Sequence, residues 1–185
     1  MKRCSWAEKS STEIHYHDTE WGRPSYDDDY LFEILLLETM QAGLSWATIL
    51  SKREGFKEAY DQFDYRKIAS YTENNFSELL QNPGIIRHKL KIQSTQSNAI
   101  AFLKIQEAYG SFSHYIWGFV DGRPIDNKWE KIEDVPSKTD LSDDISQDLK
   151  KKGFKFIGST TIYSFLQAVG IVNDHMVDCF VREDR

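Results

Sequence analysis

The chain has 185 residues, of which 40% are hydrophobic, enough for the core of one domain or two tightly joined lobes and too many for a disordered protein. No run reaches the roughly eighteen apolar residues of a membrane helix, and the first residues lack the apolar stretch of a secretory signal. We therefore expect a cytoplasmic protein, in which the two cysteines, Cys4 and Cys179, favour thiol chemistry or a metal over a disulfide.

The formal net charge of -6 at pH 7 argues against nonspecific coating of nucleic acid, because a polyanion repels an acidic protein. Two local groups of basic residues stand out against this average: Arg87, His88, Lys89 and Lys91, and further along the chain Lys150, Lys151, Lys152 and Lys155. Charge alone leaves open whether they attract an anionic partner or are solvated helix ends.

Helical periodicity dominates the sequence and predicts a mainly α fold. The first clear helix is capped by Ser25 or Asp27 and runs to about Gln41. Its spacing predicts one buried face, and Glu38 interrupts the apolar residues of that face. The face comprises Leu31, Ile34, Leu35, Glu38 and Ala42.

Further helices are predicted from their starts and stops. Thr72 begins a short helix that ends at Leu80, and a break at 82–84 precedes a long helix that ends near Tyr109 before Gly110. A short helix follows over residues 111–117.

The region 121–140 is rich in charged residues and contains Pro124 and Pro136, which predicts a long surface connection. Helices resume near Ser142. The sequence GFKFIG at 153–158 then separates two helices, the second of which starts at Thr160 or Thr161 and runs to about Val169.

A first candidate site combines two cysteines and two histidines, ligand types that close a tetrahedral zinc site: Cys4, His17, His175 and Cys179. On a helix, the four-residue spacing of His175 and Cys179 would place both side chains on one face. Four protein ligands leave no open position for water, so such a metal would be structural and would join the two ends of the chain. Two buried thiols and two unrelated histidines remain the alternative, because the gap from Cys4 to His17 fits no short zinc-finger pattern.

A second candidate site is Glu38 with nearby aromatic residues: Trp6, Tyr16, Trp21 and Trp46. A carboxylate on an apolar helix face must be neutral, paired or reserved for a cationic ligand. Aromatic faces attract cations and stack on flipped bases, so this set suits a positively charged purine. An ordinary aromatic core with Glu38 bonded to a histidine or an arginine is the alternative.

The third candidate is the GFKFIG segment, which follows three lysines. Its glycines permit a tight turn, and the amides that open the next helix can hold a phosphate. A plain helix connection with solvated lysines explains the same pattern.

Several dispersed blocks of the chain resemble the type I 3-methyladenine DNA glycosylases of the helix-hairpin-helix superfamily, and the resemblance covers nearly the whole chain. The blocks are RCSW at 3–6, YHDTEWG at 16–22, LETMQAGLSWATIL at 37–50, FDYRKIA at 63–69, GIIRHKLKI at 84–92 and KKGFKFIGSTTIYSFLQAVGIVNDH at 151–175.

The resemblance implies a helix-hairpin-helix glycosylase fold built as a single unit over 1–185. A helical lobe would span about 26–170, and segments 1–25 and 171–185 would be joined through one structural Zn²⁺. The implied zinc ligands are Cys4, His17, His175 and Cys179.

The resemblance also implies roles for the other candidate residues. Glu38 would be the catalytic recognition carboxylate, with base-binding residues Tyr16, Trp21, Trp46 and Trp6. The implied DNA contacts are Gln41, Gly43 and Leu44 in the segment that enters the duplex, and Gly153, Lys155 and Gly158 in the hairpin.

Some positions depart from the family's pattern or need separate interpretation. Glu13 occupies a position that is often aromatic and His15 one that is often small, and both differences bear on the rim of the pocket. Asp174 lies near the position of a superfamily aspartate, but its neighbour His175 is an implied zinc ligand. We therefore interpret Asp174 as structural, oriented toward a backbone or imidazole partner.

The implied function is base excision repair. A monomer would flip 3-methyladenine out of double-stranded alkylated DNA, hydrolyse its glycosidic bond, and release the free base to leave an abasic site. No lysine adjoins the pocket motifs to act as a Schiff-base nucleophile, so we expect a monofunctional hydrolase. Two other classes stay open: a noncatalytic binder of alkylated DNA, and a zinc hydrolase of small molecules, which would need an open coordination position.

Overall fold

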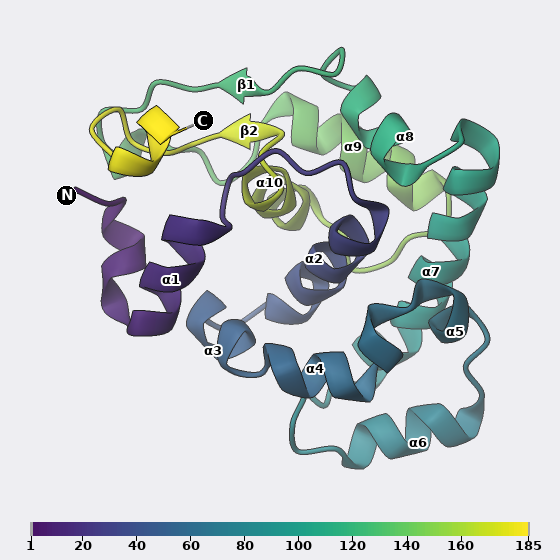
Figure 1. The fold of residues 1–185 in the computed structure, drawn as a ribbon. Helices are drawn as coiled ribbons and strands as arrows, with labels where there is room; N and C mark the ends of the chain where they lie inside the picture. The colour runs from purple at the N-terminus through teal and green to yellow at the C-terminus, as the bar shows by residue number, and fades with distance from the viewer. Residues whose placement is uncertain (1, 185) are drawn as a thin grey trace.

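The computed structural model describes the backbone of residues 2–184 and the side chains of residues 2–182, and the described part is mainly helical. Helix α2 (Asp28–Gln41) lies at its centre (Figure 1). It contacts α3 (Trp46–Ser51), α7 (Lys89–Tyr109), α8 (Phe112–Gly118) and α10 (Ser159–Ala168). None of the described helices is long and apolar enough to cross a membrane.

The surroundings of α2 correct the prediction of a single buried face. Its N-cap is Asp27, whose carboxylate accepts from the backbone N–H of Asp29, and Ser25 lies outside the helix. Leu36, on the side opposite the predicted face, is buried as well, because neighbouring helices surround α2. Ala42, assigned to the buried face, is the exposed C-cap residue.

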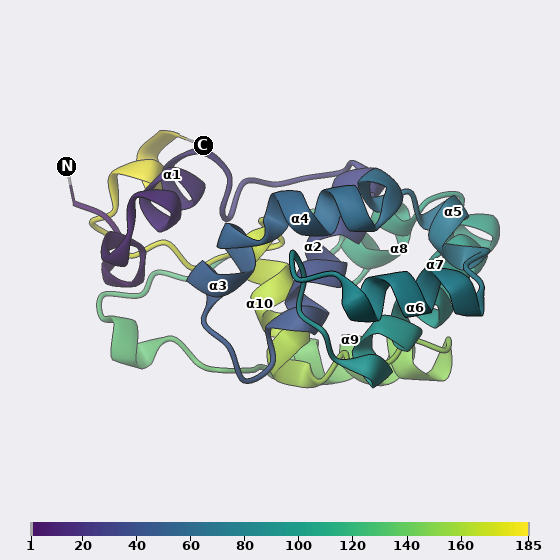
Figure 2. The same ribbon diagram turned by 90° about the horizontal axis from the view of Figure 1, so that it is seen from below.

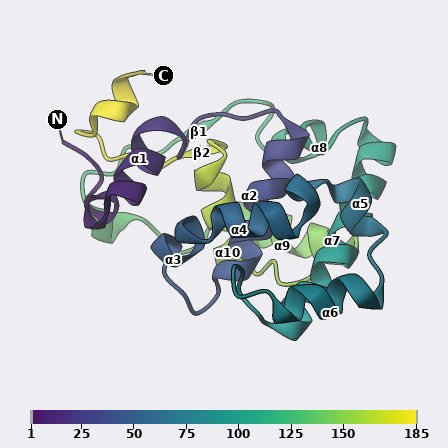
Figure 3. The same ribbon diagram turned by 60° about the horizontal axis from the view of Figure 1, so that its bottom comes forward.

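Helices α5 (Tyr65–Ala69), α6 (Glu73–Gln81) and α7 lie together at the end of the molecule opposite α1, and α4 (Arg53–Ala59) runs across the middle from α3 toward them (Figures 2 and 3). The predicted limits of α6 and the predicted end of α7 are confirmed to within one residue, whereas α7 starts at Lys89, about four residues after the predicted break at 82–84. Thr72 and Asn75 form a capping box, and Gly110 ends α7 at a φ of 85°. Helix α8 begins after its N-cap Ser111, as predicted.

The two ends of the described chain meet on one side of the molecule (Figure 1). The N-terminal part forms a 3-10 helix, η1 (Ser5–Lys9), and α1 (Ser11–Thr19). The C-terminal part contains β2 (Val172–Asn173) and η4 (Phe180–Asp184), and the backbone N–H of Phe180 donates to the carbonyl of Lys2 at 3.0 Å. This contact positions the four candidate metal ligands near one another.

The region 121–140 is more ordered than the predicted surface connection. It contains β1 (Ile125–Asp126), which pairs in parallel with β2, and a 3-10 turn, η3 (Ile132–Asp134). The backbone N–H of Ile125 donates to the carbonyl of Ile171 at 2.9 Å. Most of its residues are exposed, so the predicted surface connection is confirmed, and the short strand that the sequence did not predict forms by pairing with a strand that is distant in sequence.

Two helices joined by a tight turn complete the fold. Helix α9 (Asp140–Lys151) begins with a capping box of Thr139 and Ser142, and α10 begins at Ser159, one residue before the predicted start. The turn contains Gly153 at a φ of 104° and Phe156 at a φ of 57°. The Ser146 hydroxyl on α9 donates to the Ile157 carbonyl at 2.6 Å and fixes the turn to the helix before it.

Candidate active site

A cavity of about 180 Å³ opens between α1, α2, α3 and α10. This volume is close to that of an apolar cavity that holds one small aromatic molecule, about 150 Å³. Its walls come from several separate parts of the chain: Trp6, Tyr16, Trp21, Glu38, Gln41, Trp46, Ile132, Val135, Ser164, Gln167 and Asp174. Glu38 and the four predicted aromatic residues all line it.

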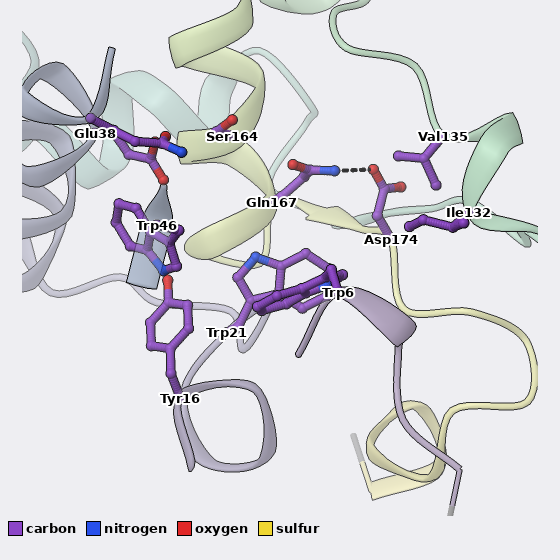
Figure 4. Close-up of a pocket in the computed structure, with 11 residues that line it drawn as sticks. Trp6, Tyr16, Trp21, Glu38, Trp46, Ile132, Val135, Ser164, Gln167 and Asp174 are labelled. Atoms are coloured by element: carbon purple, nitrogen blue, oxygen red, sulfur yellow. Dashed lines mark hydrogen bonds between the residues drawn. The ribbon is translucent and has the colours of Figure 1, made fainter. Parts of the chain in front are cut away.

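The aromatic residues form two adjacent pairs on the cavity wall (Figure 4). The rings of Tyr16 and Trp46 are 5.7 Å apart between centroids and inclined at 51°. The rings of Trp6 and Trp21 are 4.9 Å apart and inclined at 71°. A flat ligand can contact several of these rings at once, and a cationic ligand gains additional attraction from their faces.

Glu38 presents a carboxyl group to this aromatic cavity. Its residue is 4% exposed, and its Oε2 atom has no hydrogen-bond partner among the described residues. Burial raises the pKa of Glu38 to about 8, because removal from water disfavours the charged form. The alternative of a core glutamate bonded to a histidine or an arginine is therefore wrong.

Tyr16 supplies a second buried polar atom without a partner. Its hydroxyl has no hydrogen-bond partner among the described residues, and burial raises the pKa of Tyr16 well above its usual value. Buried polar atoms are nearly always paired, so two unpaired ones that line the same cavity indicate that a ligand with polar edges completes their bonding.

Asp174 lies at the other end of the cavity from Glu38 (Figure 4). Its Oδ1 atom accepts from Asn127 at 2.9 Å and from the Trp129 indole at 2.7 Å. Its Oδ2 atom accepts from the Tyr163 hydroxyl at 2.5 Å and from Gln167 at 2.7 Å. The expected backbone or imidazole partner is wrong. Four side-chain donors hold this carboxylate and tie the 121–140 region to α10.

Four lining residues were absent from the sequence-based candidates: Ile132, Val135, Ser164 and Gln167. Ser164 and Gln167 are three residues apart on α10, a spacing that places them on one helix face. The predicted start of α10, together with this spacing, could have indicated that both residues lie on the same helix face. Ile132 and Val135 carry no such signal, because they reach the cavity through the β1–β2 pairing and the Asp174 contacts.

The four candidate metal ligands are buried, and their ligand atoms all lie within 4.8 Å of one another. Nδ1 of His175 is 3.7 Å from the Cys4 sulfur and 3.5 Å from the Cys179 sulfur. The Cys179 sulfur is also 3.5 Å from Nε2 of His17. Sulfur and nitrogen ligands of a tetrahedral zinc ion are about 3.6 Å apart. The spacing therefore fits a metal.

The remaining nitrogen of each imidazole also has a partner. Nδ1 of His17 lies 2.9 Å from a carboxylate oxygen of Asp18, and Nε2 of His175 lies 3.1 Å from the carbonyl of Trp21. Such contacts orient metal-binding histidines. His175 and Cys179 are not on a helix, so the one-face geometry that a helix would give their spacing does not apply. A turn brings them together, with the Cys179 N–H donating to the Met176 carbonyl.

The predicted DNA contacts lie in two separate places. Gln41 lines the cavity, and beyond it Gly43 has a φ of 82° and Leu44 is 39% exposed. The others are in the turn between α9 and α10: Gly153, Lys155 and Gly158. Lys155 is exposed, and Gly158 is the N-cap of α10.

The positions that depart from the family pattern do not line the cavity. Glu13 is buried, and its carboxylate accepts from the Ser10 hydroxyl at 2.9 Å at the start of α1. His15 is exposed on the same helix. Glu13 thus stabilises the N-terminal end of α1. Neither Glu13 nor His15 forms part of the cavity wall.

Comparisons with known proteins agree with this arrangement. A family model described as methyladenine glycosylase matches residues 6–183. DNA-3-methyladenine glycosylase of Haemophilus influenzae is 47% identical over 96% of this chain and 96% of its own length. DNA-3-methyladenine glycosylase 1 of Escherichia coli is 45% identical over 97% of this chain and 96% of its own length.

A solved structure has the same fold. The Staphylococcus aureus 3-methyladenine DNA glycosylase I, studied for its recognition of 3-methyladenine, superposes with a TM-score of 0.94 at 40% identity and covers 98% of this chain and 96% of its own chain. The family match, the near-complete coverage and the shared fold lead to one conclusion. The chain belongs to the methyladenine glycosylase family.

Proposed function

We propose that this protein is a monofunctional DNA glycosylase of base excision repair, which flips 3-methyladenine out of alkylated DNA into the cavity beside Glu38 and hydrolyses its bond to deoxyribose. The observation that carries the proposal is the buried, unpaired carboxyl of Glu38 in an aromatic cavity of about 180 Å³. The family relatives named as DNA-3-methyladenine glycosylases support the choice of substrate.

The cavity distinguishes the lesion from normal adenine by charge. Methylation at N3 makes the base cationic within the nucleotide, and the faces of Tyr16 and Trp46 attract a cation. The same positive charge favours the ionised form of Glu38, whose carboxylate then accepts hydrogen bonds from the polar edge of the base. Uncharged adenine gains neither contribution in full.

The chemical step needs little acid catalysis. The C1′–N9 bond breaks, and its electron pair stays on N9 and neutralises the cationic base. The oxygen of a water molecule bonds to C1′, and its proton passes to solvent. No lysine among the described residues lines the cavity, so a Schiff-base nucleophile is missing and the product is an abasic site.

The α9–turn–α10 unit supports the assignment to the helix-hairpin-helix superfamily. Exposed Lys155 and the first amides of α10 would hold the phosphate backbone. Gly43 and Leu44 lie two and three residues after the cavity residue Gln41, and they would enter the duplex at the position that the flipped nucleotide vacates.

The metal site would hold one structural zinc ion through Cys4, His17, His175 and Cys179, whose spacing fits such an ion. A zinc ion there would fasten the two ends of the chain and so fix Trp6, Tyr16 and Trp21 at the cavity. We treat residues 1–185 as one unit for this reason, and as a monomer because one chain supplies the whole cavity. Four protein ligands leave no position for a hydrolytic water, which disfavours a zinc hydrolase.

The proposal is tested by incubating the purified protein with alkylated duplex DNA and identifying the purines released. We expect free 3-methyladenine in amounts that exceed the enzyme concentration, together with abasic sites in the DNA. Tight binding of the DNA without release of a base would instead indicate a noncatalytic binder and would overturn the enzymatic assignment.

A further inference from the structure

A buried lysine reaches the C-terminal end of α2 from a neighbouring helix. Lys91 on α7 is 5% exposed, and its Nζ atom donates to the Met40 carbonyl at 3.2 Å. No carboxylate among the described residues forms an ion pair with it, and burial lowers the pKa of Lys91. Burying an ammonium group without a counterion is costly, so a specific function for it is expected.

The ammonium group of Lys91 lies at the C-terminal end of α2, where the helix has no cation of its own. The last carbonyls of a helix have no partners within the helix, and the dipole makes that end partly negative. The last turn of α2 contains no basic residue of its own. Lys91 therefore supplies, from α7, the cation and the hydrogen-bond donor that the end of α2 needs.

The end of α2 is also where the proposed DNA-entering segment begins. Met40 directly precedes Gln41, which lines the cavity, and the Leu44 N–H donates back to the Gln41 carbonyl at 2.7 Å. Lys91 thus holds the carbonyl of the residue directly before Gln41, whose own carbonyl closes the turn after α2. Glu38 lies less than one turn earlier, but its pKa is raised by burial with no effect from Lys91.

We propose that Lys91 is a positioning residue that fixes the end of α2 and thereby orients Gln41, Gly43 and Leu44 toward DNA, without acting on the free base. The inference rests on the proposed function, because it assigns that segment to the duplex. It predicts that loss of the ammonium group affects excision from DNA far more than binding of 3-methyladenine itself.

The test compares Lys91→Met, which keeps the apolar stem, with Lys91→Arg, which keeps a cationic donor. Lys104→Met is the matched control, because Lys104 is an exposed residue of the same helix. Each variant is assayed for kcat and KM on alkylated duplex DNA and for Kd of free 3-methyladenine by tryptophan fluorescence. Amide hydrogen exchange of residues 41–45 is measured alongside.

We expect Lys91→Met to lose about tenfold to a hundredfold in kcat/KM on DNA, as for a displaced positioning group, while the Kd of the free base changes less than about threefold. Exchange of residues 41–45 should accelerate, Lys91→Arg should recover most of the activity, and Lys104→Met should match the wild type. Excision by Lys91→Met at the wild-type rate would overturn the inference, as would equal losses in excision and free-base binding.

Two further measurements cover the cases in which Lys91→Met does not fold or the wild type releases no base. If Lys91→Met does not fold, Lys91→Gln is measured in the same way, because it keeps a donor of shorter reach. If the wild type itself releases no base, the proposed function fails, and hydrogen exchange still decides the positioning role. Unchanged exchange of residues 41–45 in a folded variant would overturn that role regardless of activity.

Discussion

The side-chain amide of Asn98 on α7 binds both backbone groups of Lys155 in the turn between α9 and α10. Asn98 Oδ1 accepts from the Lys155 N–H at 2.8 Å, and its Nδ2 donates to the Lys155 carbonyl at 3.1 Å. A residue of the long helix therefore sets the conformation of a turn that the sequence places 57 positions away. The turn proposed to hold DNA phosphates is preorganised by this pair of bonds.

Asn98→Ala should weaken the interaction with DNA and leave the base cavity intact. Removing both bonds frees a backbone N–H and a carbonyl of an exposed residue, and each lost bond contributes about 0.5–1.5 kcal/mol. We expect KM for alkylated duplex DNA to rise about tenfold, with an unchanged Kd for free 3-methyladenine. Ser97→Ala is the control, because among the described residues the Ser97 hydroxyl bonds only to its own helix, at the Ser94 carbonyl. Equal KM values for the two variants would refute this role of Asn98.

Trp46→Ala should weaken binding of the free base directly. Trp46 forms one wall of the cavity beside Tyr16, and stacking of a base on an aromatic ring contributes about 1–3 kcal/mol. We expect the Kd of 3-methyladenine, measured by calorimetry, to rise at least about fivefold, with a near-native melting temperature. Trp129→Phe provides the contrast, because Trp129 bonds to Asp174 at the far end of the cavity. A Trp46→Ala variant that binds the base as tightly as the wild type would contradict the assignment.

The buried carboxyl of Glu38 predicts a stability that depends on pH. Its folded pKa of about 8 lies above its ordinary value of 4.5, so the folded protein binds more protons than the unfolded chain between these pH values. Wild-type stability should therefore fall as pH rises through this interval, by up to about 4 kcal/mol at 1.36 kcal/mol per pKa unit.

Glu38→Gln removes this titration. The stability of the variant relative to the wild type should therefore increase as pH rises. We expect the variant to gain on the wild type between pH 5 and pH 8.5, by several degrees in melting temperature, at about 2–4 °C per kcal/mol for a chain of this size. Thermal unfolding of both proteins at the two pH values measures the difference. A constant difference between them would show that Glu38 does not titrate in this range.

How much of the molecule the sequence predicts depends on whether the signal is local. Caps such as Thr72, Asp27 and Gly110 act within one turn of helix, and their predictions are confirmed. Glu38 was identifiable because a carboxylate contradicts the apolar pattern around it.

Features made by distant segments were missed or misjudged. The four donors to Asp174 come from two separate regions of the chain, and β1 exists because β2 lies beside it. Helix α1 was not predicted as a helix, since its residues lack a periodic apolar pattern. It is fixed instead by the Ser10 cap and by packing against η1.

The metal site predicts that stability depends on zinc. We expect about one zinc ion per chain by elemental analysis, and removal of the ion should destabilise the fold by at least about 4 kcal/mol, the effect of a ligand present at roughly a thousand times its Kd. The melting temperature should then fall by about 10 °C on chelation. Cys179→Ser should show the lower melting temperature without chelator. Full stability of a metal-free protein would refute the structural role.

A single methyl group added at Gly170 should greatly reduce the free energy of unfolding. It has a φ of 73°, and a Cβ there would lie 2.4 Å from the backbone carbon of Arg23 and from the nitrogen of Pro24. Gly170→Ala should therefore lose about 2–4 kcal/mol in the free energy of unfolding, from overpacking and a left-handed backbone. Gly110→Ala is the matched control, because its φ is 85° but no atom lies within 4 Å of the added Cβ. Similar losses in denaturant unfolding would show that the contact with the Arg23 backbone carries no cost.

The role of Glu38 in lesion recognition is tested by a single-turnover measurement of 3-methyladenine release from alkylated duplex DNA by the wild type and by Glu38→Gln. We expect rapid release by the wild type and a rate at least about a hundredfold lower for the folded, metal-loaded variant, because the amide cannot carry the negative charge that the cationic base requires. Release by Glu38→Gln at the wild-type rate would show that this buried carboxyl does not recognise the lesion.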